Sequence, residues 1–337
     1  MTRRRPARPF LAAALIVVVV PLLAGCASKQ NSLAPESKPA REITHLWWNM
    51  LIGSALGLGI VALLLFAAWW RRGHAGIPRV GDGERFSMLV VLGLGVGVPI
   101  VVLATLFVFA NILIIGDTQA PAASKTKLTI QVVARQWFWE IRYPGTTAVT
   151  ANELHIPVRT PVNLEVTTAD VIHSFWVPQL NRKIDTIPGQ TNRILLYADK
   201  AGRYRGQCAE FCGLQHAHMS MYVFADPPAR FRAWLANEAK SAAAPAAQQA
   251  GERVFLEGPC ANCHAIRGTA AKGYVGPDLT HLGSRTSLGA LTLPNDRTRL
   301  ASWIVDSQHF KPGNQMPNIE LTRPQLNAVV DYLESLK

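Results

Sequence analysis

A twelve-residue segment gathers two thiols, an imidazole and a thioether, at Cys208, Cys212, His216 and Met219. Thiolate and thioether sulfurs are soft ligands that favour copper, and imidazole also binds copper. His173, which lies 35 residues upstream, supplies a second imidazole that two neighbouring strands can bring to this segment. The donor set predicts a copper site. A Cys208–Cys212 disulfide is the alternative that an exported compartment permits, and zinc fits less well because methionine is foreign to zinc sites.

A different chemistry is indicated by Cys260-Ala-Asn-Cys263-His264. The Cys-x-x-Cys-His spacing places two thioether bonds on the haem vinyl groups and the following imidazole on the iron. A zinc ribbon would need a second pair of ligands, but no cysteine follows Cys263. A thioredoxin motif would follow a strand, whereas residues 251–256 have a helical pattern. We therefore expect one covalent haem c.

The sixth ligand of the haem iron should be a methionine or a histidine further along the chain. Met316, in Gly-Asn-Gln-Met316-Pro, is the only methionine after Met221. His281 and His309 are the competing ligands. The expected axial pair is His264 and Met316.

The fifth cysteine belongs to the N-terminus. Arginines at positions 3, 4, 5 and 8 precede an apolar run over residues 10–23, which is typical of an export signal. Leu23-Ala-Gly-Cys26 resembles a bacterial lipobox, in which the cysteine is acylated after cleavage. The sequence predicts a signal over 1–25, an acylated Cys26 and an exported segment over 26–44. A plain signal anchor with a bystander cysteine is the alternative.

Two apolar blocks, over about 45–70 and 86–115, exceed the roughly 20 residues that a helix needs to cross a bilayer. Tryptophan pairs begin and end the first block, as in an interfacial aromatic belt. The loop between the blocks carries Arg71, Arg72, Arg79 and Arg85, so we expect it to be cytoplasmic. The sequence predicts a transmembrane hairpin over 45–117 that sends the rest of the chain outside. A pair of buried core helices is the alternative.

The overall charge does not point to nucleic acid. The 337 residues carry 34 Lys and Arg against 22 Asp and Glu, but the basic excess is largest beside the apolar blocks. A nucleic-acid-binding protein would need a basic stripe on a soluble domain. The sequence shows none, so we expect no nucleic-acid partner.

Two soluble domains follow the hairpin. Residues 127–224 show short period-two runs, over 128–133, 154–158, 162–166 and 193–197, which predict an antiparallel β-sandwich or small barrel. An alanine-rich linker over 229–250 comes next, and we expect it to keep the two domains apart. The last domain, over 251–337, should be helical, with Thr322 capping a final helix whose apolar positions run from Leu326 to Leu336.

The copper motif, with Val171-Ile-His173-Ser-Phe before it and the membrane hairpin, resembles the binuclear copper (CuA) region of cytochrome c oxidase subunit II. The resemblance implies a cupredoxin-like β-barrel over 122–228. It implies that Cys208 and Cys212 bridge two copper ions per chain and that His173 and His216 bind one ion each. Two weaker ligands are implied as well: the thioether of Met219 and the backbone carbonyl of Glu210. The Glu210 side chain would bind a magnesium ion shared with subunit I.

The same resemblance assigns two further positions. The first is the stretch Gln136-Trp137-Phe-Trp139, whose composition alone indicates core aromatic residues. In the family such a stretch lies over the copper, and electrons enter through its first tryptophan, which is Trp137 here. The family also has a glutamate in its second membrane helix through which protons reach subunit I. The matching position here is Leu92, so this carboxylate is missing and the sequence assigns no proton-entry residue.

The last domain resembles class I cytochrome c through Gly251, Phe255 and Gly276-Pro277, and the carbonyl of Pro277 would orient His264. Together the motifs resemble a subunit II of the haem–copper oxidases with a fused cytochrome c. That family implies a multi-pass protein of the bacterial inner membrane with both cofactor domains on the periplasmic side. Its partners would be oxidase subunits I and III and an external donor, either a cytochrome c or a quinol–cytochrome c reductase. Subunits of another terminal reductase, such as nitric oxide reductase, and copper-delivery proteins are the alternatives.

Overall fold

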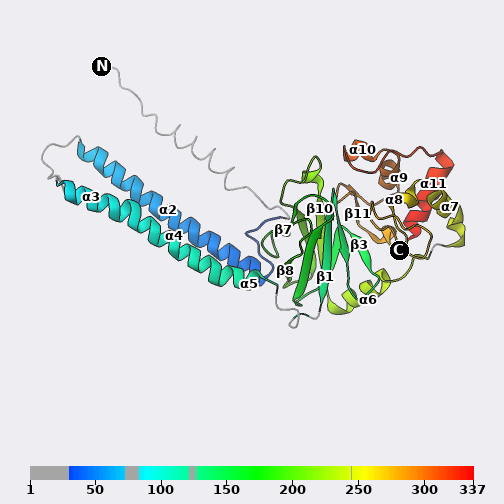
Figure 1. Cartoon of the computed structure of the whole chain (residues 1–337), viewed down its shortest axis with the longest axis horizontal. Helices are drawn as coiled ribbons and strands as arrows, with labels where there is room; N and C mark the ends of the chain where they lie inside the picture. Colours follow the sequence, from blue (N-terminus) through cyan, green and yellow to red (C-terminus); the bar gives the residue numbers. More distant parts are fainter. Residues whose placement is uncertain (1–29, 73–82, 121–125, 127, 244) are drawn as a thin grey trace, which may run out of the picture.

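The computed structural model describes residues 30–72, 83–120, 126, 128–243 and 245–337. The expected export signal, Cys26 and Arg79 lie outside these residues. The molecule has three parts in line: a long helical hairpin, a β-domain in the middle, and a helical domain on the far side of the β-domain (Figure 1).

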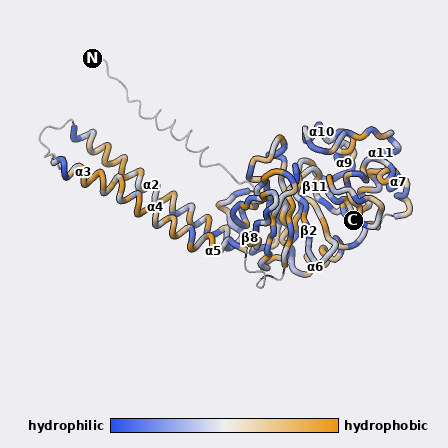
Figure 2. Tube along the Cα trace, viewed as in Figure 1, coloured by the Kyte–Doolittle hydropathy of each residue, from blue (hydrophilic) through white to orange (hydrophobic). Residues whose placement is uncertain are grey.

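The hairpin pairs α2 (Lys38–Arg72) with a second helical rod over 84–118. That rod is made of α3 (Glu84–Leu92), η1 (Gly93–Gly97), α4 (Val98–Phe109), η2 (Ala110–Ile115) and α5 (Gly116–Thr118). Both rods are apolar along most of their length (Figure 2). Lys38–Arg72 and Glu84–Ile112 are long and apolar enough to cross a membrane, and none of the most apolar window in either helix is buried. The core-helix alternative is therefore wrong.

The first helix begins seven residues before the apolar block because its first turns belong to the junction with the β-domain. Ser37 and Ala40 are buried there, and the Ser37 hydroxyl donates to the carbonyl of Leu180. Arg41 forms an ion pair with Asp199. These contacts fix the base of the hairpin against the β-domain.

The β-domain consists of two five-stranded sheets. The first has the order β3-β2-β1-β5-β8 and the second the order β4-β10-β9-β6-β7. Their bounds are β1 Thr129–Arg135, β2 Phe138–Arg142, β3 Val149–Ala151, β4 Glu153–Pro157, β5 Val162–Thr168, β6 His173–Trp176, β7 Ile184–Thr186, β8 Asn192–Leu196, β9 Gly202–Cys208 and β10 Ser220–Asp226. Alternate residues face inward along β1 and along the second half of β5, which is the period-two pattern that predicted strands here.

The sequence predicted an antiparallel sandwich or barrel, and most strand pairs are antiparallel, but two are not. Strands β1 and β5 pair in parallel, and so do β10 and β4. Parallel neighbours need a crossover rather than a tight turn. The chain crosses between the two sheets, so strands distant in sequence become neighbours, which matches a cupredoxin-like barrel.

The residues after the β-domain form α6 (Pro228–Glu238), which packs on the sheet. Phe231 is buried, and Trp234 stacks on the ring of His155 with 3.9 Å between centroids. The segment expected as linker from residue 229 therefore begins with a helix that belongs structurally to the β-domain.

The last domain is helical around a small hairpin. Its elements are η5 (Ala246–Gln248), α7 (Gln249–Glu257), α8 (Cys260–Cys263), η6 (Leu282–Ser284), β11 (Ser287–Leu288), β12 (Leu293–Pro294), α9 (Arg297–Val305), α10 (Ser307–Phe310) and α11 (Arg323–Ser335). Thr322 caps α11 with a complete capping box, as its sequence predicted. The β11–β12 pair was not expected, since two-residue strands leave no periodic signal.

The two soluble domains are in direct contact. Thr286 of the helical domain donates through its backbone amide to Glu153 Oε1 of the β-domain at 2.8 Å. Arg267 donates to the carbonyl of Glu238 at 2.5 Å, and Gln215 Nε2 donates to the carbonyl of Pro312 at 2.6 Å. The expectation that the linker keeps the domains apart is wrong.

Candidate metal centre and haem cavity

Three strands of the second sheet bring the copper-motif residues together. Cys208 ends β9, and it lies opposite Phe175 of β6, two residues after His173. The backbone amide of Cys208 donates to the carbonyl of Met219, just before β10, at 2.9 Å. The loop between β9 and β10, with the short helix η4 (His216–His218), therefore folds back over the end of β6.

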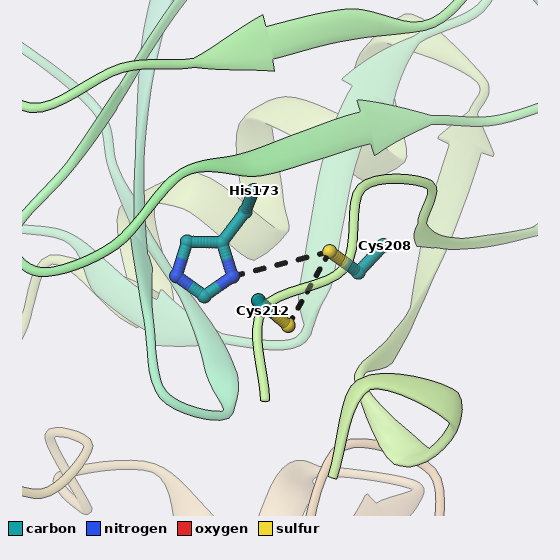
Figure 3. A group of neighbouring side chains, drawn as sticks. All are labelled: His173, Cys208 and Cys212. Atoms are coloured by element: carbon teal, nitrogen blue, oxygen red, sulfur yellow. Dashed lines mark hydrogen bonds between the residues drawn. The ribbon is translucent and has the colours of Figure 1, made fainter. Parts of the chain in front are cut away.

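The donor atoms form a compact cluster around the two sulfurs, and Figure 3 shows these sulfurs with the ring of His173 beside them. The Sγ atoms of Cys208 and Cys212 are 3.7 Å apart. His173 Nδ1 lies 3.9 Å from Cys208 Sγ, and the carbonyl of Glu210 lies 3.1 Å from it. On the other side, His216 Nδ1 lies 3.7 Å and the Met219 Sδ atom 3.9 Å from Cys212 Sγ.

These separations fit metal ligands. Sulfurs in a disulfide are about 2.05 Å apart, so the disulfide alternative is wrong for this structure. Ligands placed tetrahedrally about 2.0–2.3 Å from an ion are about 3.3–3.8 Å from one another. The donor set of Cys208, Cys212 and His173 is buried, and these ligand atoms lie within 4.8 Å of one another. The cluster can hold soft metal ions between its sulfurs.

The two thiols also have the electrostatics of a shared cation site. The hydrogen bond from Cys212 lowers the pKa of Cys208 to about 3, with a smaller contribution from His173. The same contact, together with burial, raises the pKa of Cys212. The surroundings of Cys208 thus favour its thiolate, which is the form of cysteine that binds a metal cation.

By the family resemblance, Asp170 matches a position near the copper and subunit I, and the structure places it beside the cluster. His173 Nε2 lies 2.7 Å from Asp170 Oδ1, and its hydrogen bond to this carboxylate leaves Nδ1 facing the sulfurs. Burial lowers the pKa of His173, but the bonds to Asp170 and Cys208 outweigh it and the pKa is raised. Carboxylates that hold a ligand histidine in this way fix its ring and increase its basicity.

Two residues of the motif point away from the cluster. The side chain of His218, which has no counterpart in the copper motif of the family, is exposed. The Glu210 side chain is 44% exposed and has Lys183 Nζ at 3.8 Å. Only the backbone of Glu210 therefore joins the copper cluster.

The aromatic stretch divides between core and site. Trp139 is fully buried and packs edge-on against Phe175. Trp137 lies at the domain surface, where its Nε1 donates to the carbonyl of Cys212 at 3.0 Å. Composition could not separate the two tryptophans, and strand alternation would place residues two apart on the same face. They differ because Trp137 lies in the turn before β2, which begins at Phe138.

The helical domain contains a largely apolar cavity of about 320 Å³. Cys260, Cys263 and His264 line it together with Met316, and so does Trp137 of the β-domain. His281 and His309, the competing ligands, do not line it.

The His264 ring is set for an axial position. Its Nδ1 donates to the carbonyl of Pro277 at 2.8 Å, which leaves Nε2 free to bind iron. A Cβ atom on Gly276 would lie 2.4 Å from the His264 Cε1 atom, so only glycine allows this approach. The predicted contact between Pro277 and His264 is present in the structure.

The Met316 backbone is held by three polar side chains. Its carbonyl accepts from Ser307 Oγ and Gln308 Nε2, both at 2.8 Å. Its amide donates to Asn314 Oδ1 at 2.7 Å. The cysteine pair, the oriented imidazole and the anchored thioether fit a covalent haem c.

Both soluble domains resemble known protein families. Residues 146–225 match the family model for the cytochrome C oxidase subunit II periplasmic domain, and residues 248–337 match that for cytochrome c. The chain is 31% identical to cytochrome c oxidase subunit 2 of Alkalihalophilus pseudofirmus, over 94% of each chain. It is 29% identical to that of Bacillus subtilis, over 96% of this chain and 97% of the relative. The crystal structure of the periplasmic domain of subunit II of cytochrome oxidase of Bradyrhizobium japonicum aligns with a TM-score of 0.33 at 32% identity, over 35% of this chain and 96% of that one.

The relatives of this chain are subunits of a respiratory oxidoreductase, and the matches extend across the hairpin, the β-domain and the helical domain. The family models imply copper for the β-domain and haem for the helical domain. The chain belongs to the cytochrome c oxidase subunit 2 family, in a form that also carries a cytochrome c domain.

Proposed function

We propose that this chain passes electrons from an external donor through its haem c and a binuclear copper centre to the haem–copper subunit I of an oxidase. The single observation that carries the proposal is the position of Trp137. Its side chain lines the cavity that would hold the haem, and its Nε1 donates to the carbonyl of Cys212 in the copper cluster. One residue thus connects the two cofactor sites, which supports its role as the point where electrons enter the copper domain.

In the copper site, Cys208 and Cys212 would bridge two copper ions. His173 and His216 would each bind one ion, and Met219 and the carbonyl of Glu210 would be the weak ligands. The spacing of 3.1–3.9 Å around the two sulfurs supports this set. A copper pair of this kind supplies one-electron transfer with little change in geometry, because the charge is spread over both ions.

In the haem site, Cys260 and Cys263 would form the thioether bonds, and His264 and Met316 would bind the iron. A methionine–histidine pair raises the reduction potential of a haem, which suits a carrier that donates to copper. Pro277 keeps the proton on His264 Nδ1, and the apolar lining excludes water from the cavity.

The proposed setting is the bacterial inner membrane, with both cofactor domains on the periplasmic side. The two apolar helices and the family support a membrane anchor. Subunit I would receive the electrons, reduce oxygen to water and pump protons, and subunit III would complete the assembly. The half-exposed carboxylate of Glu210 would bind magnesium at the contact with subunit I.

The test is to purify the full chain with its membrane partners and measure metals, spectra and substrate together. We expect two copper ions and one haem c per chain, a seven-line copper hyperfine pattern in electron paramagnetic resonance, and oxygen consumption. A four-line pattern from a single copper ion would contradict the binuclear site. Reduction of nitric oxide without oxygen consumption would contradict the oxidase assignment.

Matched variants sharpen this test. Cys208→Ser should abolish the copper pair, because a bridging thiolate is lost. Met219→Leu should leave the pair assembled and shift its potential, since a weak ligand is replaced by an apolar side chain of similar size. Haem content should be unchanged in both variants.

A further inference from the structure

Lys311 is a buried lysine at the boundary between the two cofactor domains. It follows α10 and is only 3% exposed. Among the residues that the structure describes, no carboxylate forms an ion pair with it. A buried charge without a counter-ion is costly unless all its donors are used. Burial accordingly lowers the pKa of Lys311 to about 7.

All three donors of this ammonium are used, and each finds a backbone carbonyl on a different segment. Nζ donates to Trp137 O at 2.7 Å, to His218 O at 3.0 Å and to Gly289 O at 3.1 Å. The first two acceptors belong to the copper domain and the third to the haem domain. An ammonium group has three N–H donors and can serve all three carbonyls, which a neutral amine cannot.

The segments joined by Lys311 are those that carry the cofactor ligands. Five residues after Lys311 the chain reaches Met316, and both residues line the haem cavity. His218 lies between His216 and Met219 of the copper motif. The nitrogen of Lys311 thus touches the backbone of the copper-ligand loop while its own loop continues to the proposed haem ligand.

Neighbouring contacts lie along the same boundary between the two domains. Gln215 Nε2 donates to the carbonyl of Pro312, and a Cβ atom on Gly313 would lie 2.8 Å from the Leu214 side chain. Trp137, whose carbonyl Lys311 binds, reaches Cys212 with its indole. The two ligand-bearing loops therefore meet at Trp137, where Lys311 binds three carbonyls that belong to both domains.

We infer that Lys311 is a positioning residue that clamps the haem-bearing loop onto Trp137 and the copper-ligand loop, so that electrons cross between the domains at a fixed docking geometry. The inference rests on the proposed function for the identity of the two cofactors. Electron transfer slows steeply with separation, so a side chain that holds the two loops in contact sets the rate without binding either cofactor.

The first test measures haem-to-copper electron transfer in the full chain within its membrane complex, after rapid photoreduction of the haem. Lys311→Met keeps the length and the apolar stem but removes the donors. We expect at least a tenfold slower transfer at matched driving force, with haem and copper contents unchanged, and partial recovery in Lys311→Arg, which can still donate to carbonyls. Lys272→Met, on an exposed lysine of the same domain, is the matched control and should transfer at the wild-type rate. A wild-type rate in Lys311→Met with both cofactors present would overturn the inference.

The second test uses the unaltered protein and does not measure electron transfer. It therefore remains possible if Lys311→Met fails to fold. The unaltered complex is acetylated briefly with an amine-selective reagent, and each lysine is quantified by mass spectrometry. We expect Lys311 to be modified at least tenfold less than Lys272. Equal modification would show that the clamp is open in solution and would overturn the inference. Absence of the copper pair or haem in the same sample would instead contradict the proposed function.

Discussion

The imidazole of His173 is held by a carboxylate that does not itself face the sulfurs. Asp170 Oδ1 accepts from His173 Nε2, and Asp170 Oδ2 accepts from the backbone amide of Gln136 at 2.6 Å. The aspartate thereby ties the candidate ligand to the residue before Trp137. Its charge should stabilise a metal-bound imidazole, and its geometry should keep Nδ1 aimed at the copper cluster.

Asp170→Asn keeps the size and one acceptor but removes the charge. We expect the copper site to assemble with about 10–100-fold weaker retention, the usual cost of losing such a partner. Competition with a copper chelator, followed by optical absorption, measures this. The control is Asp331→Asn. Asp331 is a partly exposed residue of α11 that pairs with Arg297, and the variant should retain copper normally. Equal retention in the two variants would exclude a role for the Asp170 charge.

The proposed sixth haem ligand gives a second prediction. Met316→Ala should leave the haem attached through Cys260 and Cys263 but open the iron to carbon monoxide and remove the methionine–iron charge-transfer band. His309→Ala is the control, because His309 lies outside the haem cavity, and it should keep the band. A band that persists in Met316→Ala would place the sixth ligand elsewhere.

Single residues were predictable where a short motif combines several side chains that bind metals. The thiols, imidazoles and thioethers of both motifs could be selected because few combinations of these side chains suit anything but metals. Asp170 and Lys311 are common residue types whose roles depend on partners that the fold supplies. For Lys311, two of the three acceptors lie 93 and 174 residues away. No local pattern marks such contacts.

At the scale of elements, α7 and α11 cross with almost no space between them. A Cβ atom on Gly251 would lie 2.0 Å from the carbonyl oxygen of Ala328 and 2.7 Å from the Tyr332 Cβ atom. Both neighbours belong to the helix α11, so neither can move aside alone. This crossing places α7, and the Cys260–Cys263 turn that follows it, over the haem cavity.

Gly251→Ala should therefore force the two helices apart. We expect a loss of about 1–3 kcal/mol from overpacking, which lowers the melting temperature of a domain of this size by several degrees or more. Thermal loss of the methionine–iron charge-transfer band measures it. Gly202→Ala is the control, because its Cβ atom would meet only the Tyr204 ring, at 3.6–3.9 Å. Equal melting temperatures would mean that the helices can adjust.

Element types were largely predictable, while their pairing was not. The runs over 162–166 and 193–197 correspond to β5 and β8, and the capping signal at Thr322 begins α11. Hydrophobic period reports which face of a strand is buried, but it carries no information about which strand lies beside it. The parallel pairs β1–β5 and β4–β10 therefore came only from the structure.

For the whole molecule, composition indicated a linker but not the docking of the domains that it connects. An alanine-rich segment looks the same whether its domains are in contact or apart. Here the interface is polar and specific: Glu153 accepts from both the amide and the hydroxyl of Thr286, and Arg267 reaches the carbonyl of Glu238. The haem domain is thus held by its contacts as well as by its connection.

This architecture predicts that electron transfer is insensitive to linker length. A mobile, tethered domain would deliver electrons in proportion to its effective concentration, which falls as the linker grows. A docked domain keeps its geometry. Insertion of a short Gly-Ser segment after Ala243, an exposed position, should leave the haem-to-copper rate within about twofold of the original.

The matched control combines this insertion with Glu153→Ala and Arg267→Ala. Those substitutions leave Thr286 and the Glu238 carbonyl without their interface partners, and each broken hydrogen bond should cost about 1–3 kcal/mol of docking. In the weakened background the inserted residues should slow electron transfer. The haem domain then spends time undocked, and the longer linker lowers the effective concentration at which it docks again. The rates are read by the same photoreduction measurement, with haem and copper contents determined in each sample. If the insertion alone slows transfer as much as it does in the weakened background, the domains are held by the linker and not by their interface.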